Sequence, residues 1–443
     1  MNPELRRLLW LEATPQRLWL TPLALFGSAF VVGRYAEVAV PSLALLGFVG
    51  LALFWGMRQA ANAVLDEVRE HTWDLQRMSA LSPWAMTWGK LAGATLMPWY
   101  AGACALAIYF AYRPPEMLAL SVTWAVFLAL SAVVAQGLGL LGAVVGIHRD
   151  QQRRAHLHLA LVLVLLGMAL PDTLGVVFAG LPELGPESGR VAWYGRSFAG
   201  ADFTLALAAS LAAWAVFGAH RAMCIELKVR TRPWAWSAFA LYLAIIAHGF
   251  WSQDGNASAG GLFSVLALVA ALLAYVAGFA FARDPVQYRR LLQAWRDGHG
   301  RRVVEDLPLW LSSIGLALAC ALAAAALGAA PALSNERPDN LGGAALALVL
   351  LALRDLALLT AFSFFERSRR AEILSVLIIA LLNHLAPAFL LAIGAAPLAG
   401  LVSPALFDSP AVAALVTLVQ AGAASALAVF AWRRAMAGTQ PTR

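Results

Sequence analysis

Long, unbroken runs of apolar residues follow one another along the whole chain. The runs at 121–147 and 307–330 each exceed the roughly 20 residues that a membrane-spanning helix needs. Runs of this kind predict spans at 19–34, 41–62, 88–110, 119–146, 157–172, 201–220, 235–251, 261–282, 308–330, 343–364, 373–392 and 411–431. The pattern therefore predicts an all-α polytopic membrane protein with about twelve transmembrane helices.

The composition supports this interpretation. Hydrophobic residues make up 61% of the chain and charged residues 13%, whereas soluble domains are about 45–50% apolar and about 25% charged. Inside lipid, only helices and closed barrels satisfy every backbone polar group, and a barrel would show segments of about ten residues with alternating polarity. The continuous runs favour helices.

Basic residues gather in every second loop. If both termini are cytoplasmic, 26 of the 32 Lys and Arg residues fall in cytoplasmic segments, five fall in outer loops, and Arg354 falls within a span. This asymmetry is what the positive-inside rule requires. The net charge of +7 is thus a signal of topology. The sequence has no basic stripe interleaved with aromatic residues, so a nucleic-acid partner is not expected. It also has no small-residue cleavage site after the first apolar run, so no removable signal is expected.

The two halves of the chain resemble each other. The sequence ACALA at 103–107 recurs at 319–323, and Pro171 in the fifth span matches Pro387 in the eleventh, both at an offset of 216 residues. Internal repeats of this kind are common in transporters. They predict two six-span halves, 1–222 and 223–443. Because each half has an even number of spans, the halves should have the same orientation.

The longest cytoplasmic stretch of the first half follows the second span. It is amphipathic over 66–90, begins with acidic residues and leads into the third span. Its notable positions are Glu67, Arg69, Glu70, Trp73, Leu81, Ser82, Pro83, Trp84, Gly89 and Lys90. This order, with a Glu-rich start, an aromatic residue, a Leu/Ser-Pro-aromatic turn and Gly-Lys, resembles the coupling helix in the permease subunits of type-2 ABC exporters.

The resemblance implies the membrane-spanning subunit of an ATP-driven exporter that works by alternating access. Separate cytoplasmic ATPase subunits, two for each chain, would push on the coupling segments. The sequence contains no G-x-x-x-x-G-K-[ST] phosphate-binding loop, because Gly89 and Lys90 lack the upstream glycine. This chain is therefore expected to be no enzyme and to bind no cofactor itself, with ATP and Mg²⁺ held by the partner.

Two interpretations of the segment 66–90 remain open. In the first, its acids and arginines face a soluble partner while Trp73 and Trp84 anchor it to the bilayer. In the second, it is an interfacial amphipathic helix with no coupling role, since tryptophans are common at headgroup depth.

The corresponding loop of the second half, 283–307, diverges from the first. It lacks the Ser-Pro-aromatic turn, and Asp306 occupies the position of Lys90. Either one ATPase is engaged differently by this loop, or two different ATPase chains dock.

A few polar residues interrupt the spans, and such residues usually face a cavity or a partner. Arg354 and Asp355 lie in the middle of the tenth span, and Gln136 lies at a nearby position of the fourth. Adjacent residues on a helix project about 100° apart, so we expect that Arg354 and Asp355 do not neutralise each other. They would line the translocation path or join neighbouring spans. Asn383 and His384 are expected to pack between helices.

The positions of the histidines and cysteines predict neither a metal site nor disulfide bonds. Histidines cluster near the fourth and fifth spans, where interfacial positions explain them better than a metal site does; they are His148, His156 and His158. The cysteines, Cys104, Cys224 and Cys320, lie far apart, so neither a disulfide framework nor a ligand set is predicted.

Two functions of other classes compete with the exporter. An ion-driven secondary transporter also commonly has twelve spans, and Asp355 is the well-placed buried acid that it would need. An enzyme acting on lipids is disfavoured, because the outer loops lack clustered polar residues. The preference for 30 Arg over 2 Lys indicates a GC-rich bacterial genome and hence a bacterial inner membrane. Lipid, and a further periplasmic or membrane protein, are the other expected partners.

Overall fold

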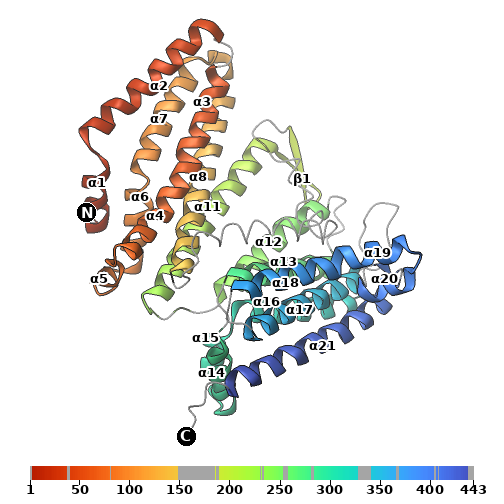
Figure 1. Ribbon diagram of the computed structural model, residues 1–443. Helices are drawn as coiled ribbons and strands as arrows, with labels where there is room; N and C mark the ends of the chain where they lie inside the picture. The colour runs from red at the N-terminus through yellow and green to blue at the C-terminus, as the bar shows by residue number, and fades with distance from the viewer. Residues whose placement is uncertain are drawn as a thin grey trace. The chain divides into compact units, whose positions relative to one another are not determined.

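The computed structural model describes residues 2–36, 40–79, 81–147, 185, 189–229, 231, 234–252, 258–280, 284–327, 341–365, 369–403, 406–407 and 409–437 (Figure 1). Helices make up 87% of the described residues. Ten of them are long and apolar enough to cross a membrane, and one bent pair brings the number to eleven if it is counted as a single span. The chain is an all-α, multi-pass membrane protein.

The described residues form two compact units. The first contains α1 (Pro3–Glu12), α2 (Pro15–Ala36), α3 (Val40–Phe48), η2 (Val49–Trp55), α4 (Gly56–Arg69), α5 (Trp73–Arg77), α6 (Pro83–Gly93), α7 (Leu96–Ala111), η3 (Pro115–Met117), α8 (Leu118–Gly146) and α11 (Gly200–Glu226). The second contains α12 (Trp234–Trp251), α13 (Ala259–Ala280), α14 (Pro285–Arg296), α15 (Gly300–Asp306), α16 (Leu309–Ala326), α17 (Leu341–Phe365), α18 (Arg369–Ala380), η5 (Leu381–Leu385), α19 (Ala386–Ala392), α20 (Ala396–Val402) and α21 (Pro410–Ala437).

Eleven of the predicted spans coincide with these helices. The remaining one, 157–172, lies outside the described residues. The second span is longer than predicted, because α4 continues as an amphipathic helix to Arg69.

The third predicted span, 88–110, is broken rather than straight. It consists of α6 and α7, which meet at 44°. Pro98 lies in the first turn of α7, where its ring has no N–H and would clash with the carbonyl of Ala94 in a continuous helix. Thr95 at the break donates its hydroxyl to the Leu91 carbonyl at 2.5 Å, a local bond that bends helices.

Small residues bring the helices of the first unit close together. A Cβ at Gly139 of α8 would lie 2.5 Å from the Met57 carbonyl oxygen of α4, and one at Gly137 would lie 3.0 Å from the Cβ of Ala215 in α11. Close approach at glycine is the usual basis of helix packing in lipid, where no hydrophobic driving force acts between helices. The helix α8 therefore lies between α4 and α11.

A two-stranded hairpin, β1 (Arg190–Trp193) and β2 (Arg196–Ala199), is the one sheet among the described residues. Tyr194 and Gly195 form its turn with φ of 49° and 68°, the left-handed conformation that short hairpin turns require. The tip packs within the second unit, where the Tyr194 amide donates to the Gly249 carbonyl of α12 at 2.9 Å.

Candidate functional site

The predicted coupling segment forms the end of α4, all of α5 and most of α6. The helix α4 ends at Arg69, and His71 just beyond it has a left-handed backbone (φ 58°), with the Thr72 N–H donating to the Glu67 carbonyl at 2.9 Å. This is the usual hydrogen-bonded reversal at a helix C-terminus. The Ser-Pro-aromatic turn is a helix start, because Ser82 caps α6 by accepting from the Ala85 amide at 3.2 Å and Pro83 follows in the first turn.

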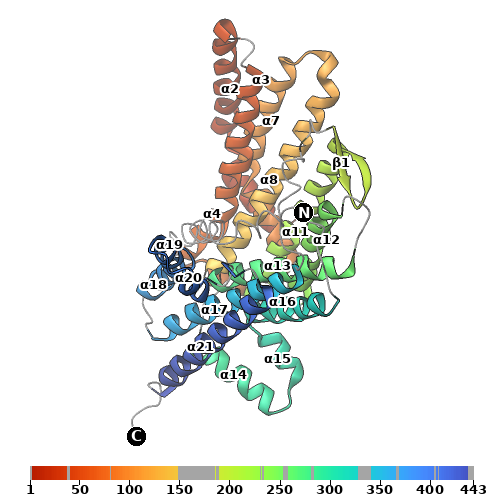
Figure 2. The ribbon, with the colours of Figure 1, turned by 90° about the vertical axis from the view of Figure 1, so that its right-hand side faces the viewer.

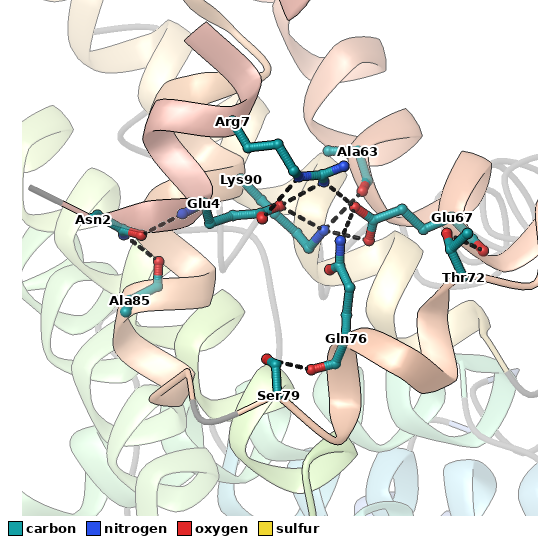
Figure 3. Close-up of polar contacts among 10 residues, drawn as sticks. All are labelled: Asn2, Glu4, Arg7, Ala63, Glu67, Thr72, Gln76, Ser79, Ala85 and Lys90. Carbon is teal, nitrogen blue, oxygen red and sulfur yellow. Dashed lines mark hydrogen bonds and ion pairs between the residues drawn. The ribbon is translucent and has the colours of Figure 1, made fainter. Parts of the chain in front are cut away.

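Five polar side chains from four helices meet beside this segment (Figure 3). We call them the ion cluster: Glu4 and Arg7 of α1, Glu67 of α4, Gln76 of α5 and Lys90 of α6. Lys90 has no exposed side-chain surface. Its ammonium group donates to Glu4 Oε1 at 3.3 Å, to the Ala63 carbonyl at 3.1 Å and to Glu67 Oε2. All three donors of the ammonium group therefore have acceptors.

Arg7 completes the charge balance of the ion cluster. Its guanidinium donates through Nε to Glu4 Oε2 at 3.1 Å, and through one terminal nitrogen to Glu4 Oε1 at 2.9 Å and Glu67 Oε1 at 2.6 Å. Gln76 Nε2 donates to the same Glu67 oxygen at 2.5 Å. Two carboxylates thus face two cations, which is the condition under which buried charges are tolerated.

The ion cluster shifts the pKa values of its two members on α1, Glu4 and Arg7. Burial opposes ionisation of Glu4, but the hydrogen bond from Arg7 and the charges of Lys90 and Arg7 together outweigh burial and hold the pKa of Glu4 below its ordinary value. The hydrogen bond to Glu4 raises the pKa of Arg7. Both groups are therefore charged at neutral pH.

Glycines on α6 let α1 reach the ion cluster. A Cβ at Gly89 would lie 2.7 Å from the Cβ of Glu4, and a Cβ at Gly93 would lie 2.8 Å from the Cβ of Leu8. The backbones of α1 and α6 are therefore in direct contact, as in other small-xxx-small helix pairs. Asn2 adds to this contact by donating to the Ala85 carbonyl at 2.5 Å.

Trp73 joins the coupling segment to α11. Its side chain is buried, and its Nε1 donates to Glu226 Oε1 at 3.4 Å. Arg77 Nε lies 3.5 Å from the same oxygen. The Lys90 ammonium lies 5.5 Å from the centre of the Trp73 ring, within cation–π range. The helix α5 is thus attached to α4, α6 and α11 through side chains.

Two expectations about this segment are wrong. Glu67 does not face a soluble partner, because α1 covers it and supplies Arg7. Trp73 does not anchor the segment in the bilayer, because it is buried in the first unit. The missed members of the site are Glu4, Arg7, Gln76 and Glu226. For two of them, Glu4 and Arg7, the sequence contained a signal: their spacing of three residues places both side chains on one face of α1.

The other predicted residues lie outside the ion cluster. Arg69 pairs with Asp66 at 2.8 Å on the exposed side of α4, and Glu70 beside it is exposed. Trp84 is about half exposed, and Leu81 packs at the edge of the core. Two apolar side chains are exposed here, Leu75 of α5 at 67% and Met78 directly after it at 76%, beside the exposed Asp74.

The second loop is built differently. Its helices α14 and α15 form a helical hairpin (Figure 2), and within 284–307 none of the residues is buried. The hairpin is held by indole N–H groups: Trp310 donates to Tyr288 at 3.0 Å and Trp432 donates to the Pro285 carbonyl at 3.0 Å. Asp306, at the position of Lys90, is exposed at the end of α15.

Arg354 and Asp355 form an ion pair, so the expectation that they do not neutralise each other is wrong. Arg354 donates to Asp355 Oδ1 through two nitrogens, at 2.9 and 2.8 Å. Tyr275 of α13 and Asn383 of η5 donate to the other Asp355 oxygen at 2.8 and 3.0 Å, and Gln420 of α21 accepts from Arg354 at 2.7 Å. The long Arg354 side chain reaches the carboxylate of its neighbour, and projection angles of the helix backbone alone do not consider this reach. Both residues are buried contacts between helices, and a role in the translocation path stays a prediction.

Gln136 also makes hydrogen bonds between helices. Its amide accepts from Trp99 Nε1 of α7 at 3.0 Å and donates to the Ala52 carbonyl of the π-helical turn η2 at 2.8 Å. Gly56 makes room for it, because a Cβ there would lie 2.5 Å from the Gln136 amide nitrogen. Gln136 thus joins three helices in the apolar interior of the first unit.

Within the described ranges, no group of three or more His, Cys, Asp and Glu residues has the geometry of a metal site. The histidines at 148, 156 and 158 lie outside those ranges. Comparison of the chain with protein-family models, with curated proteins and with solved structures gave no match in any of the three.

Proposed function

We propose that the chain is the membrane-spanning permease subunit of an ATP-driven ABC exporter in a bacterial inner membrane, with twelve spans in two parallel six-span halves and both termini in the cytoplasm. Two separate ATPase subunits would bind ATP and Mg²⁺ and drive alternating access. The observation that carries the proposal is the construction of the coupling segment. Leu75 of α5 and Met78 directly after it are exposed apolar side chains, while Trp73 and Gln76 attach α5 to α4, α6 and α11, which form or lead into spans.

The exposed surface of α5 has the character of a protein contact. Leu75 on this short helix and Met78 directly after it lie at the proposed cytoplasmic end of the unit, near the charged residues Glu70 and Asp74 in the sequence. Interfaces typically combine an apolar centre with a polar rim. An ATPase that binds there would act directly on α4 and α6.

Packing in the two units supports the duplication. The helix α8 packs on α11 in the first unit and α17 packs on α21 in the second, and these are the fourth and sixth spans of each proposed half. Gln136 of α8 and the Arg354–Asp355 pair of α17 lie at similar places in these spans. The ion-driven alternative receives less support, because the Asp355 carboxylate is neutralised by Arg354.

Co-purification with each ATPase encoded beside the chain tests the proposal. We expect one of them to bind and to hydrolyse ATP faster in the complex. Leu75→Asp should weaken binding at least about 30-fold, the size of a typical hot-spot loss, as measured by titration of the ATPase onto the purified chain. Val229→Asp is the matched control, since Val229 is also an exposed apolar residue beyond the end of a spanning helix. If no neighbouring ATPase binds, the proposed function is wrong.

A further inference from the structure

The N-terminal helix α1 contributes half of the charges in the ion cluster. Glu4 and Arg7 bond to each other and also to Lys90 of α6 and Glu67 of α4. All of these residues belong to the first unit. The helix α1 is therefore attached to both sides of the coupling segment, to the helix that precedes α5 and to the helix that follows it.

Separation of these helices would leave charges without partners. Lys90 is fully buried, and Glu4 and Glu67 are nearly so. A buried charge that loses its counter-ion cannot be solvated by the apolar groups around it, so the three helices that carry these charges, α1, α4 and α6, resist any motion that pulls them apart. The helix α5 is joined to them by the hydrogen bond from Gln76 to Glu67. Contact at Gly89 and Gly93 adds shape complementarity to this attachment.

The second loop has no counterpart to this arrangement among its described residues. Its hairpin is held by single hydrogen bonds from Trp310 and Trp432 and by contact of Tyr288 with Phe364. These contacts join uncharged groups, so each can break or shift without leaving a buried charge unpaired.

We propose that α1 is a working part of the coupling apparatus. Glu4 and Arg7 are positioning residues that hold α1 on α4 and α6, so that a displacement of α5 moves α1, α4, α5 and α6 as one rigid body. This inference rests on the proposed exporter function, because the displacement comes from the ATPase. It makes the first coupling segment a rigid element held by ion pairs, whereas the second loop, whose contacts with the neighbouring spans are uncharged, follows more loosely.

Two measurements on the same variants test the proposal. Spin labels at Leu11→Cys on α1 and Ser79→Cys after α5, in a chain whose Cys104, Cys224 and Cys320 are replaced, report the distance between the two helices by pulsed electron spin resonance. ATP turnover of the complex with the bound ATPase reports coupling. The variants are E4Q/R7Q, which removes one charge of each sign, and E12Q/R17Q, which removes an exposed Glu-Arg pair between the last residue of α1 and the first turn of α2.

We expect a narrow distance distribution in the unchanged chain and in E12Q/R17Q, with and without nucleotide, and a broad one in E4Q/R7Q. Stimulation of ATP turnover by the chain should fall about tenfold in E4Q/R7Q, within the usual range of coupling between sites, while the affinity for the ATPase stays the same. Gly93→Leu, which displaces α1 without altering a charge, should give the same result if E4Q/R7Q fails to fold.

A narrow distribution and unchanged turnover in E4Q/R7Q would overturn the inference. Failure of the exporter function has a different signature. In that case no ATPase binds the unchanged chain, whereas the distance measurement still reports whether α1 and α5 form one body.

Discussion

Lys90 illustrates how a single residue determines the form of its surroundings. An ammonium group in an apolar interior requires acceptors for all its donors, and the chain supplies two carboxylates and a carbonyl from two helices, α1 and α4. Such a group contributes more to specifying one arrangement than to net stability, because desolvation offsets much of the attraction. The same requirement explains why Glu4 and Glu67 are buried beside it.

Replacement of Lys90 alone should therefore be severe. Lys90→Met leaves Glu4 and Glu67 with only Arg7 between them, and we expect the free energy of unfolding in detergent to fall by about 3–5 kcal/mol, the usual cost of breaking a buried ion pair. The double variant E67Q/K90M should lose clearly less free energy of unfolding than Lys90→Met alone, because one of the two carboxylates is also removed. Arg69→Gln, in an exposed pair, should change stability by less than about 1 kcal/mol. Equal losses in K90M and R69Q would contradict this account.

Glu4 makes the first unit sensitive to acid. Its pKa in the folded chain is below the ordinary value of 4.5, so its ion pairs contribute stability that is fully present above that value and is lost as pH falls through the folded pKa. We expect the melting temperature to drop below about pH 4.5, and Glu4→Gln to flatten this drop while lowering stability at neutral pH. Thermal melts of the unchanged chain and of Glu4→Gln between neutral and acidic pH measure this drop. If the melting temperature falls equally with pH in the two proteins, Glu4 is not the cause of the acid sensitivity.

At the scale of elements, the contact between α1 and α6 decides whether the ion cluster can form. A glycine is needed at position 89 because the Cβ of Glu4 occupies the place where a side chain would begin. The nearest atoms are Cβ and Cγ of Glu4 and the backbone nitrogen of Leu5. Because Cβ and the backbone cannot rotate away, α1 as a whole must shift.

Gly89→Ala should therefore move α1. Overpacking of this kind typically costs about 1–3 kcal/mol, and amide hydrogen exchange in α1 should become faster because the helix is held less closely. Gly142→Ala is the control, since a Cβ at that position of α8 has nothing within 4 Å. Unchanged exchange in α1 of the Gly89 variant would show that the contact tolerates a side chain.

At the scale of the whole molecule, the sequence predicted the spans far better than the site. Lipid requires continuous apolar helices, so the hydrophobic runs alone located eleven described spans. The ion cluster was not predictable in the same way, because Glu4 and Lys90 are 86 residues apart and meet only after α1 folds back onto α6. For the same reason one interpretation of the sequence placed Glu67 on a surface that faces a soluble partner. A rule that assigns charges to exposed faces has no knowledge of a covering helix.

The predicted topology can be tested across the membrane. In a chain without its native cysteines, Ser79→Cys should react with a membrane-impermeant maleimide only in inverted vesicles, because the basic loops are expected in the cytoplasm. Glu116→Cys, in the loop between α7 and α8, should react only from the outside. Both residues are exposed in the first unit. Labelling of both from the same side would show that the number of crossings between them is even.

The pairing of Arg354 with its neighbour Asp355 has a consequence for biogenesis. A lone Arg or Asp at the centre of a spanning helix costs about 2.5–3.5 kcal/mol during insertion. Because both charges belong to α17, this helix brings its own counter-ion into the bilayer and enters as a neutral segment. Tyr275 comes from a helix made earlier, and Asn383 and Gln420 come from helices made later. The growing chain can therefore insert α17 before the helices that complete its hydrogen bonds exist.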